Sequence, residues 1–354
     1  MKKILSLLLA VTMIMLTGSI IACNQTKPNE DDTVTTKPTE NGDKEAGAQE
    51  SADTTAPAET DTDSEPVDEK ISLDGKKVIF IGNSHTYYGK TVISKTTTTQ
   101  ASRVNDKGMF YHLCRQKGME VSVTNWTFAS HNLPDTFSDG SCPKCKTDVN
   151  HKNELTDRYF DYVILQEGSA AATPESFVAI FKEVYDFFKE ANPNVKFILT
   201  LSTRAVDGNY TWIPAVEELK NSHGLIVADL GNMVWDIVKG KTEVPGATLA
   251  YDKNSFIVCR TASDGYHPNL LTGYLTSLFV YCAITGESAV GQPYALATDT
   301  KLNSAFSTIS FTSKYYTYQK PTTNFALILK SEADMNGLQQ LVDKYLEKAN
   351  GKNN

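Results

Sequence analysis

The chain of 354 residues has a long stretch without aromatic residues. Between Asn24 and Lys70 there is no Phe, Tyr or Trp, and Val34 and Val67 are the only β-branched aliphatic residues. Such a segment cannot bury enough apolar surface to offset the chain entropy lost on folding. It carries fourteen acidic and four basic residues. We therefore predict that residues 23–70 form a disordered acidic tether with an end-to-end distance of roughly 40 Å.

The rest of the chain lacks an excess of either charge. Residues 71–354 contain 28 acidic and 28 basic residues, so the net charge of −8 comes from the tether and two N-terminal lysines. A balanced charge favours neither a nucleic-acid partner nor a basic membrane-binding face. The length of this part suits one large α/β domain with insertions, and we predict a single domain over residues 71–354.

A hydrophobic run over residues 4–16 follows Lys2 and Lys3 and ends before small residues. This pattern predicts a signal peptide over residues 1–22. The run is short and no basic flank follows it, so a membrane-spanning helix is not favoured. Ala22 followed by Cys23 resembles the lipobox of bacterial lipoproteins, which implies cleavage before Cys23 and a lipid on its sulfur. We expect a membrane-anchored protein outside the cytoplasm, and the alternative is a secreted protein with an unmodified cysteine.

Apolar runs alternate with amphipathic patterns in the folded part. Near-continuous apolar runs separated by helices indicate a parallel sheet covered on both faces. In such sheets the active site lies beyond the carboxyl ends of the strands. Polar insertions at about 89–107 and 132–156 leave strand ends, so we expect them to form a rim. The predicted strands are 76–82, 120–126, 161–167, 195–201 and 225–231, and the predicted helices are 108–118, 174–193, 211–224 and a final one after residue 330.

Ser84 stands directly beyond the first predicted strand, in the turn Gly82-Asn83-Ser84. A serine hydroxyl becomes a nucleophile when a base takes its proton and a third group orients that base. His267 is the best candidate base, because Asp264 lies three residues before it and can reach its imidazole. Pro268 can serve as the first residue of the helix that follows. The alternative is that Asp264 only caps that helix.

Together, the Gly82-Asn83-Ser84 turn and the Asp264-Gly265-Tyr266-His267-Pro268 motif resemble those of the SGNH (GDSL-type) hydrolases. The resemblance runs from about residue 76 to 286. It implies a three-layer α/β/α, flavodoxin-like fold with a central, mainly parallel five-stranded sheet. It also implies that Ser84 is the nucleophile, His267 the general base and acid, and Asp264 the residue that orients His267.

The chain departs from the usual family motifs at three places. Asn83 replaces the usual Asp, and Ser130 stands where a glycine usually offers its N–H to the oxyanion. The usual asparagine of the third motif is missing after the strand that ends in Gln166. We predict Gln166 as the replacement donor, with Ser169 as the alternative. Glu167 is expected to point away from the oxyanion or to be neutralised, because a carboxylate there opposes the developing charge.

Cys142 and Cys145 have the spacing of half a zinc site. His151 and His131 are available to complete it, and a metal would then brace the rim loop. A short disulfide and two solvated thiols are the other possibilities. Because no second Cys-x-x-Cys pair exists, the sequence favours no metal, and we expect catalysis without a cofactor.

The resemblance and the tether favour a surface serine esterase that removes O-acetyl groups from carbohydrate. The substrate is then an acylated glycan or small molecule. Four aromatic residues near strand ends were candidates for stacking on sugar rings, with ordinary packing as the alternative for each: Tyr87, Tyr88, Trp126 and Trp212. A glycan-binding lipoprotein without turnover, or a lipase, thioesterase or acyltransferase with the same three residues, remains the alternative.

Overall fold

The computed structural model describes residues 70–93, 103–137, 140–145, 148–167, 172–207, 209–247, 250–258, 266–294 and 332–351. All of them belong to one compact unit, Pro66–Asn354. The predicted signal peptide, Cys23 and the tether lie outside the described residues and stay predictions. The same holds for the segment between residues 300 and 331.

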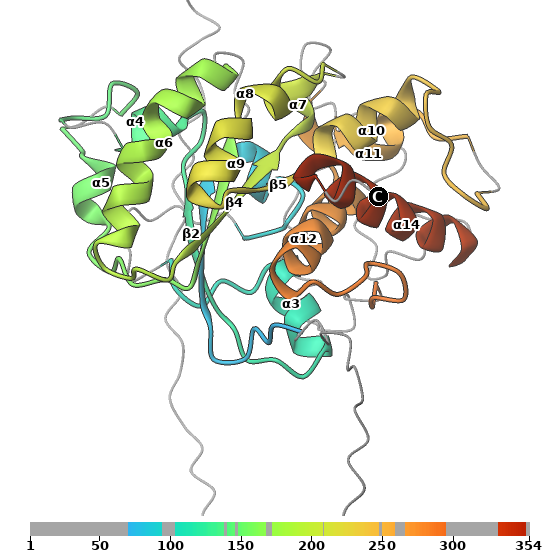
Figure 1. Ribbon diagram of the computed structural model, residues 1–354, viewed down its shortest axis with the longest axis horizontal. Helices are drawn as coiled ribbons and strands as arrows, with labels where there is room; N and C mark the ends of the chain where they lie inside the picture. The colour runs from blue at the N-terminus through green and yellow to red at the C-terminus, as the bar shows by residue number, and fades with distance from the viewer. Residues whose placement is uncertain are drawn as a thin grey trace, which may run out of the picture. The chain divides into compact units, whose positions relative to one another are not determined.

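Five parallel strands form the central sheet, in the order β2-β1-β3-β4-β5. The sheet confirms the predicted fold class, because helices cover both of its faces (Figure 1). β1 lies inside the sheet, so its carboxyl end, where the Gly82-Asn83-Ser84 turn begins, has a strand on either side. The strands are β1 (Lys77–Gly82), β2 (Ser122–Thr127), β3 (Tyr162–Glu167), β4 (Lys196–Leu201) and β5 (Ile226–Ala228).

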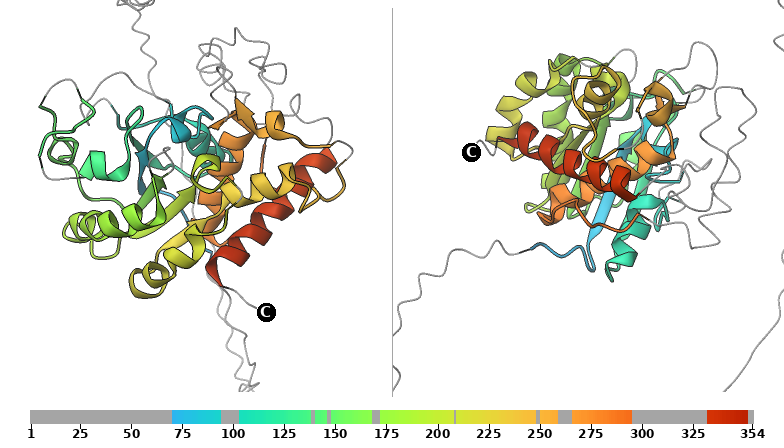
Figure 2. Two further views of the ribbon diagram at one scale, coloured as in Figure 1. Left: turned by 90° about the horizontal axis from the view of Figure 1, so that it is seen from above. Right: turned by 90° about the vertical axis from the view of Figure 1, so that its right-hand side faces the viewer.

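Helix α6 (Pro174–Lys189) covers one face of the sheet together with α4 (Leu133–Phe137), α8 (Trp212–Ala215) and α9 (Glu217–His223) (Figures 1 and 2). The residues at the start of α6 are those that favour a helix N-terminus. Thr173 caps the helix through a reciprocal pair of hydrogen bonds with Ser176, and Pro174 occupies the first turn, where its missing N–H costs nothing. Its buried face is the predicted one and includes Phe177, Phe181 and Phe188.

Helix α12 (Leu270–Thr285) packs against the opposite face of the sheet, and nearly all of its residues are buried. α3 (Met109–Gln116) and α14 (Glu332–Asn350) cover it from outside, and α10 (Leu230–Val238) lies beside it (Figure 2). This double cover explains why α12 is apolar on all sides. Gly273 allows the loop after the nucleophile turn to touch the helix, since a Cβ there would lie 1.8 Å from Gly89 O.

Three sequence-based expectations are corrected. The fifth strand ends at Ala228 rather than at 231, because Asp229 caps α10, which the sequence did not reveal. The predicted helix over 211–224 is divided into α8 and α9 at Val216. Pro268 does not begin a helix: it pairs with Ile257 across a short antiparallel ladder, and Asn269 caps α12 instead.

Six shorter elements complete the described part of the chain: α2 (Ser84–Tyr87), α5 (His151–Glu154), α7 (Thr203–Val206), α11 (Lys253–Phe256), β6 (Ile257–Val258) and β7 (His267–Pro268). A search of the described residues finds no helix with the length and apolar character needed to span a bilayer.

Candidate active site

Ser84 is the first residue of α2, two residues beyond the carboxyl end of β1. Asn83 caps this short helix: its Oδ1 accepts a hydrogen bond from His85 N at 3.0 Å. The first N–H groups of a helix have no acceptor within the helix. The backbone N–H of Ser84 is one of these groups, which makes it a candidate donor to a bound oxygen.

Gln166, near the end of the neighbouring strand β3, accepts two hydrogen bonds from this turn. Its Oε1 accepts from Asn83 N at 3.1 Å and from Thr86 Oγ1 at 2.9 Å. The contact leaves no space for a side chain at Gly82, where a Cβ would lie 2.8 Å from Gln166 Oε1. The glycine of the first motif is therefore explained by the close approach of Gln166.

His267 reaches the serine from the far end of the sequence. Its Nε2 lies 2.8 Å from Ser84 Oγ, a hydrogen-bond distance between residues 183 positions apart. Two contacts hold the residues around His267. Thr203 Oγ1 donates a hydrogen bond to Tyr266 O at 2.8 Å, and the β6–β7 ladder pairs His267 with Val258. The predicted nucleophile and base are therefore in contact. The sheet order and this contact agree with what the sequence resemblance to the SGNH-type hydrolases implied.

No protein-family model and no curated protein matches the chain. Several solved structures of this fold are similar to it. A protein described as an SGNH hydrolase, from Slackia heliotrinireducens, is 16% identical over 60% of this chain and 99% of its own, with a TM-score of 0.38. A carbohydrate acetylesterase family member from Sinorhizobium meliloti is 11% identical over 60% of this chain and 100% of its own, with a TM-score of 0.38.

A family two carbohydrate esterase from Clostridium thermocellum, solved in complex with cellohexaose, is 12% identical over 60% of this chain and 64% of its own, with a TM-score of 0.35. These similarities concern the fold. The roles of individual residues follow from the geometry of this chain.

Two aromatic rings pack against the imidazole of His267. His85 stacks on it with ring centroids 4.8 Å apart, and the ring of Tyr88 lies 4.3 Å away. Burial, and then the positive charges that His267 and Arg204 can carry, hold the pKa of His85 well below its usual range. His85 is therefore neutral at ordinary pH and does not oppose a charge that forms on His267.

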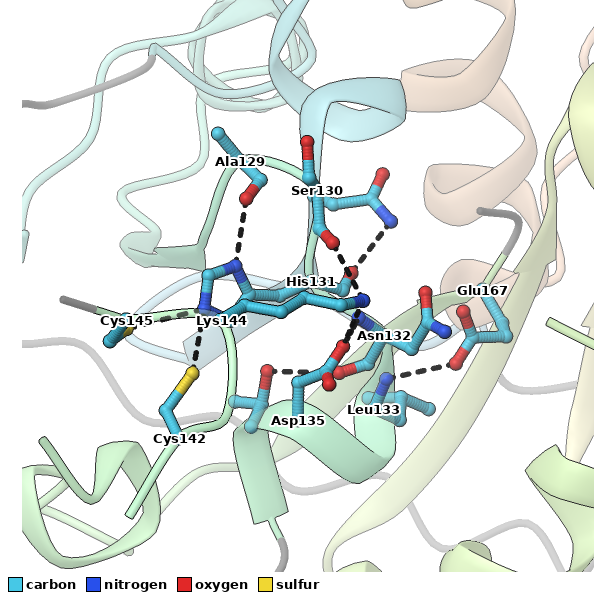
Figure 3. A network of polar contacts seen from close by, with 12 residues as sticks. Ala129, Ser130, His131, Asn132, Leu133, Asp135, Cys142, Lys144, Cys145 and Glu167 are labelled. Atoms are coloured by element: carbon cyan, nitrogen blue, oxygen red, sulfur yellow. Dashed lines mark hydrogen bonds and ion pairs between the residues drawn. The ribbon is translucent and has the colours of Figure 1, made fainter. Parts of the chain in front are cut away.

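The turn after β2 lies next to the nucleophile turn, and it is held at successive residues (Figure 3). Ser130 adopts a left-handed conformation, with a φ of 63°. Its carbonyl accepts from Lys144 Nζ at 2.9 Å. The carbonyl of His131 accepts from Asn83 Nδ2 at 2.8 Å, which joins the two turns directly.

The end of the same turn is held by two carboxylates (Figure 3). Asp135 Oδ2 accepts from Asn132 N at 2.6 Å. Glu167 is fully buried, and its Oε2 accepts from Leu133 N at 2.9 Å. The carboxylate of Glu167 thus accepts from a backbone donor at the start of α4, and its direction relative to the oxyanion stays a prediction.

The remaining site predictions have different outcomes. Asp264 and Ser169 lie outside the described residues, so their roles stay predictions. Gln166 Nε2 is buried without a hydrogen-bond partner among the described residues, and Gln166 and His85 both line a pocket about the size of one water molecule. Trp126 and Trp212 are almost completely buried, so neither stacks on a sugar.

Sequence reasoning did not find the functional contact between Asn83 and His131. An aspartate at position 83 could accept from His85 N, but it could not donate to a carbonyl. The asparagine at position 83, where the usual motif has an aspartate, was therefore the sequence signal for this contact. Its partner could not be identified, because His131 lies 48 residues further along the chain.

Cys142, Cys145 and His151 converge with His131 beside the turn after β2. Their ligand atoms all lie within 4.8 Å of one another, and the two thiols are free in the part of the chain that the structure describes. The sequence favoured no metal at these residues, because no second Cys-x-x-Cys pair exists. The structure removes that reason, because two histidines stand where a second cysteine pair would.

Proposed function

We propose that this protein is a serine esterase whose nucleophile is Ser84 and whose general base is His267. The observation that carries the proposal is the 2.8 Å contact between His267 Nε2 and Ser84 Oγ. A general base must lie within hydrogen-bond reach of the proton that it removes, and this pair meets that condition before substrate binds.

The contact supports a two-step acyl transfer. Ser84 Oγ attacks the ester carbonyl while its proton passes to His267 Nε2, and a tetrahedral oxyanion forms. Collapse of this intermediate breaks the bond to the alcohol, which takes the proton from His267 and leaves. A water molecule then attacks the acyl group on Ser84 and gives a proton to His267. The acyl–Oγ bond breaks, Ser84 Oγ takes that proton from His267, and the acid leaves. Asp264 is assigned to orient His267 during both steps.

Backbone groups from two turns are assigned to the oxyanion hole. The N–H of Ser84 begins α2, and the N–H of Ser130 belongs to the turn that Lys144 and Asn83 hold in place. Gln166 is the proposed third donor, with Ser169 as the alternative. Donors held rigidly before the reaction stabilise the transition state most, because they need no reorganisation.

The proposed substrates are O-acetyl esters on carbohydrate outside the cell. The sequence resemblance and the long acidic tether support this choice, since a tethered domain can reach a bulky polymer. Tyr88 lies against His267 at the site and is half-buried, so it stays a candidate for contact with a sugar ring. Acetyl is the smallest common acyl group and requires no deep acyl pocket.

The decisive experiment measures hydrolysis of a chromogenic acetyl ester and of acetylated glycans by the full-length protein. Ser84→Ala is expected to abolish turnover, with a loss of about 10⁶-fold in kcat, because the nucleophile is removed. A wild-type protein as inactive as Ser84→Ala on every substrate of the panel would overturn the esterase proposal and favour a glycan-binding protein.

We also propose that Cys23 carries the lipid that anchors the protein to a membrane. The wild-type protein is expected in the membrane fraction, with the mass of a diacylglyceryl cysteine at its N-terminus. Cys23→Ser is expected in the soluble fraction without lipid. A mature protein that begins at another residue and carries no lipid would contradict the anchor and leave the esterase proposal unaffected.

A further inference from the structure

Four side chains from three segments converge on a common centre beside the turn after β2. Figure 3 shows three of them, His131, Cys142 and Cys145. His131 Nε2 lies 3.0 Å from Cys142 Sγ and 3.4 Å from Cys145 Sγ. His151 Nε2 lies 3.1 Å from Cys145 Sγ. His131, Cys142 and His151 are buried, whereas Cys145 is partly exposed and leaves a route to solvent.

The spacing of these atoms fits a tetrahedral zinc ion. With Zn–S bonds of about 2.3 Å and Zn–N bonds of about 2.0 Å, sulfur and nitrogen ligands lie about 3.5 Å apart. The observed separations of 3.0, 3.1 and 3.4 Å are close to this value. Two thiolates and two imidazoles are the ligand set of many structural zinc sites, and this set excludes magnesium and calcium, which prefer oxygen.

The second nitrogen of each imidazole has its own partner. His131 Nδ1 lies 2.7 Å from the carbonyl oxygen of Ala129, so Nδ1 carries the proton and Nε2 presents its lone pair to the centre. His151 Nδ1 lies 3.4 Å from Glu154 Oε2. A histidine that binds a metal typically donates from its other nitrogen to a carbonyl or carboxylate in this way. The structure therefore contains both the ligands and the groups that orient them.

We propose that His131, Cys142, Cys145 and His151 bind one zinc ion that fixes the turn after β2. The ion would join three parts of the chain: this turn, the Cys142–Cys145 loop and the start of α5. All four positions are filled by protein, so the ion has no open coordination position. Its role is structural, and it takes no part in bond breaking.

A disulfide between Cys142 and Cys145 explains the same residues less well. It would use both sulfurs and leave the Nε2 atoms of two buried histidines facing a group that is only a weak acceptor. Buried polar atoms are nearly always paired, and zinc binding satisfies all four ligand atoms together. A disulfide also gives no reason for Ala129 O and Glu154 to orient the imidazoles.

The second step of the inference rests on the proposed function. His131 directly follows Ser130, whose N–H is assigned to the oxyanion, and its carbonyl accepts from Asn83, the neighbour of the nucleophile. The zinc ion would therefore set the position of an oxyanion donor relative to Ser84. A misplacement of about 1 Å in such a group can lower turnover by about 10²-fold.

The first experiment measures zinc in the full-length protein, purified without a histidine tag under reducing conditions. We expect about one zinc per chain by elemental mass spectrometry, and loss of most of it in Cys142→Ser and in His151→Asn. Cys282→Ala and His223→Asn alter residues of the same types outside the cluster and are expected to keep the metal. Equal zinc in Cys142→Ser and the wild type would show adventitious binding and overturn the site.

Cobalt substitution tests the ligand set in the wild-type protein and therefore does not depend on the folding of a variant. The wild-type protein with Co²⁺ in place of zinc is expected to show intense visible absorption typical of tetrahedral geometry and a near-ultraviolet thiolate charge-transfer band. A protein that takes up neither metal after reduction overturns the site. So does a mass lowered by the two thiol hydrogens in protein purified without reductant, with Cys142 and Cys145 joined in one peptide.

Chelation then tests the link to catalysis. Removing zinc is expected to lower kcat by about 10²-fold with little change in KM, and added zinc is expected to restore it. Ser84→Ala separates the two proposals, because it should bind zinc normally whether or not the protein is an esterase. Unchanged kcat after complete zinc removal would refute the positioning role and leave the metal site intact.

Discussion

The two turns that meet beside Ser84 are held in different ways. The turn between β1 and α2 is held largely by its own residues, because Asn83 caps the helix that it begins. The turn after β2 has no such cap at Ser130 and adopts a left-handed conformation there. Asp135 provides a local contact to this turn, and its other contacts come from Lys144, Glu167 and the cysteine–histidine cluster, which lie further along the chain.

This difference has a physical consequence. A turn fixed by its own cap forms as soon as its neighbours are in place, whereas a turn fixed by distant groups depends on the whole rim. A side-chain hydrogen bond from Asn83 Nδ2 to His131 O joins the two turns, and Gln166 supports the first turn from β3. Changes at these points test how strongly the second turn depends on the first.

The largest expected effect in this comparison is at Gln166. If its Nε2 is the third oxyanion donor, Gln166→Ala and Gln166→Glu both lower kcat by about 10²-fold with little change in KM, because the donor acts in the transition state. If Gln166 only supports the turn, Gln166→Glu keeps an oxygen for Asn83 N and Thr86 Oγ1 and retains most activity. Steady-state kinetics on an acetyl ester distinguishes the two.

Ser169→Ala is the companion to this measurement. It is expected to cost much less than Gln166→Ala. If Ser169→Ala loses turnover while both Gln166 variants keep it, the donor is Ser169. If all three variants keep normal kcat, the oxyanion hole consists of backbone N–H groups alone, and the assignment of this motif is wrong.

A smaller effect is expected from Asn83→Asp, although aspartate is the usual residue in the family motif. The carboxylate can still accept from His85 N, but it would place an acceptor against the carbonyl of His131. The free energy of unfolding is expected to fall by about 1–3 kcal/mol, since a buried acceptor loses its donor. We expect kcat to fall about tenfold as the second turn moves, measured together with denaturant unfolding.

Asn83→Ser removes the hydrogen bond to His131 O without placing a carboxylate against that carbonyl. Serine can cap α2 but is too short to reach His131 O, so its effect should be smaller than that of Asn83→Asp. Equal kcat and an equal free energy of unfolding in wild type and Asn83→Asp would show that the contact between the turns contributes to neither.

The elements that local patterns specify were predictable. β3 is a continuous buried run, and α6 carries its own start signal at Thr173 and Pro174. The turn that presents Ser84 follows from a small residue and a capping residue after a strand. In each case the forces that decide the structure act between residues a few positions apart.

Features decided by distant contacts were not predictable. β5 ends at Ala228 because Asp229 caps α10, and α10 contacts both α12 and α14. Pro268 pairs with Ile257 in a short ladder and does not begin a helix. His131 could be named as a possible ligand, but its meeting with Cys142 and His151 depends on how the rim packs. The contact between Ser84 and His267 was anticipated through the family resemblance, since 183 residues separate the two.

The smallest effect, and the sharpest test of the second turn, is expected at Ser130. A left-handed conformation costs a non-glycine residue about 1 kcal/mol, and glycine adopts it freely. Ser130→Gly keeps the backbone N–H and the carbonyl that accepts from Lys144. If distant contacts alone hold this turn, the variant is equally active and up to about 1 kcal/mol more stable in denaturant unfolding. Asp207→Gly relieves the same conformation after α7 and serves as the matched control. A large loss of kcat in Ser130→Gly, with no loss in Asp207→Gly, would mean that the serine side chain takes part in catalysis and that the turn offers more than its N–H.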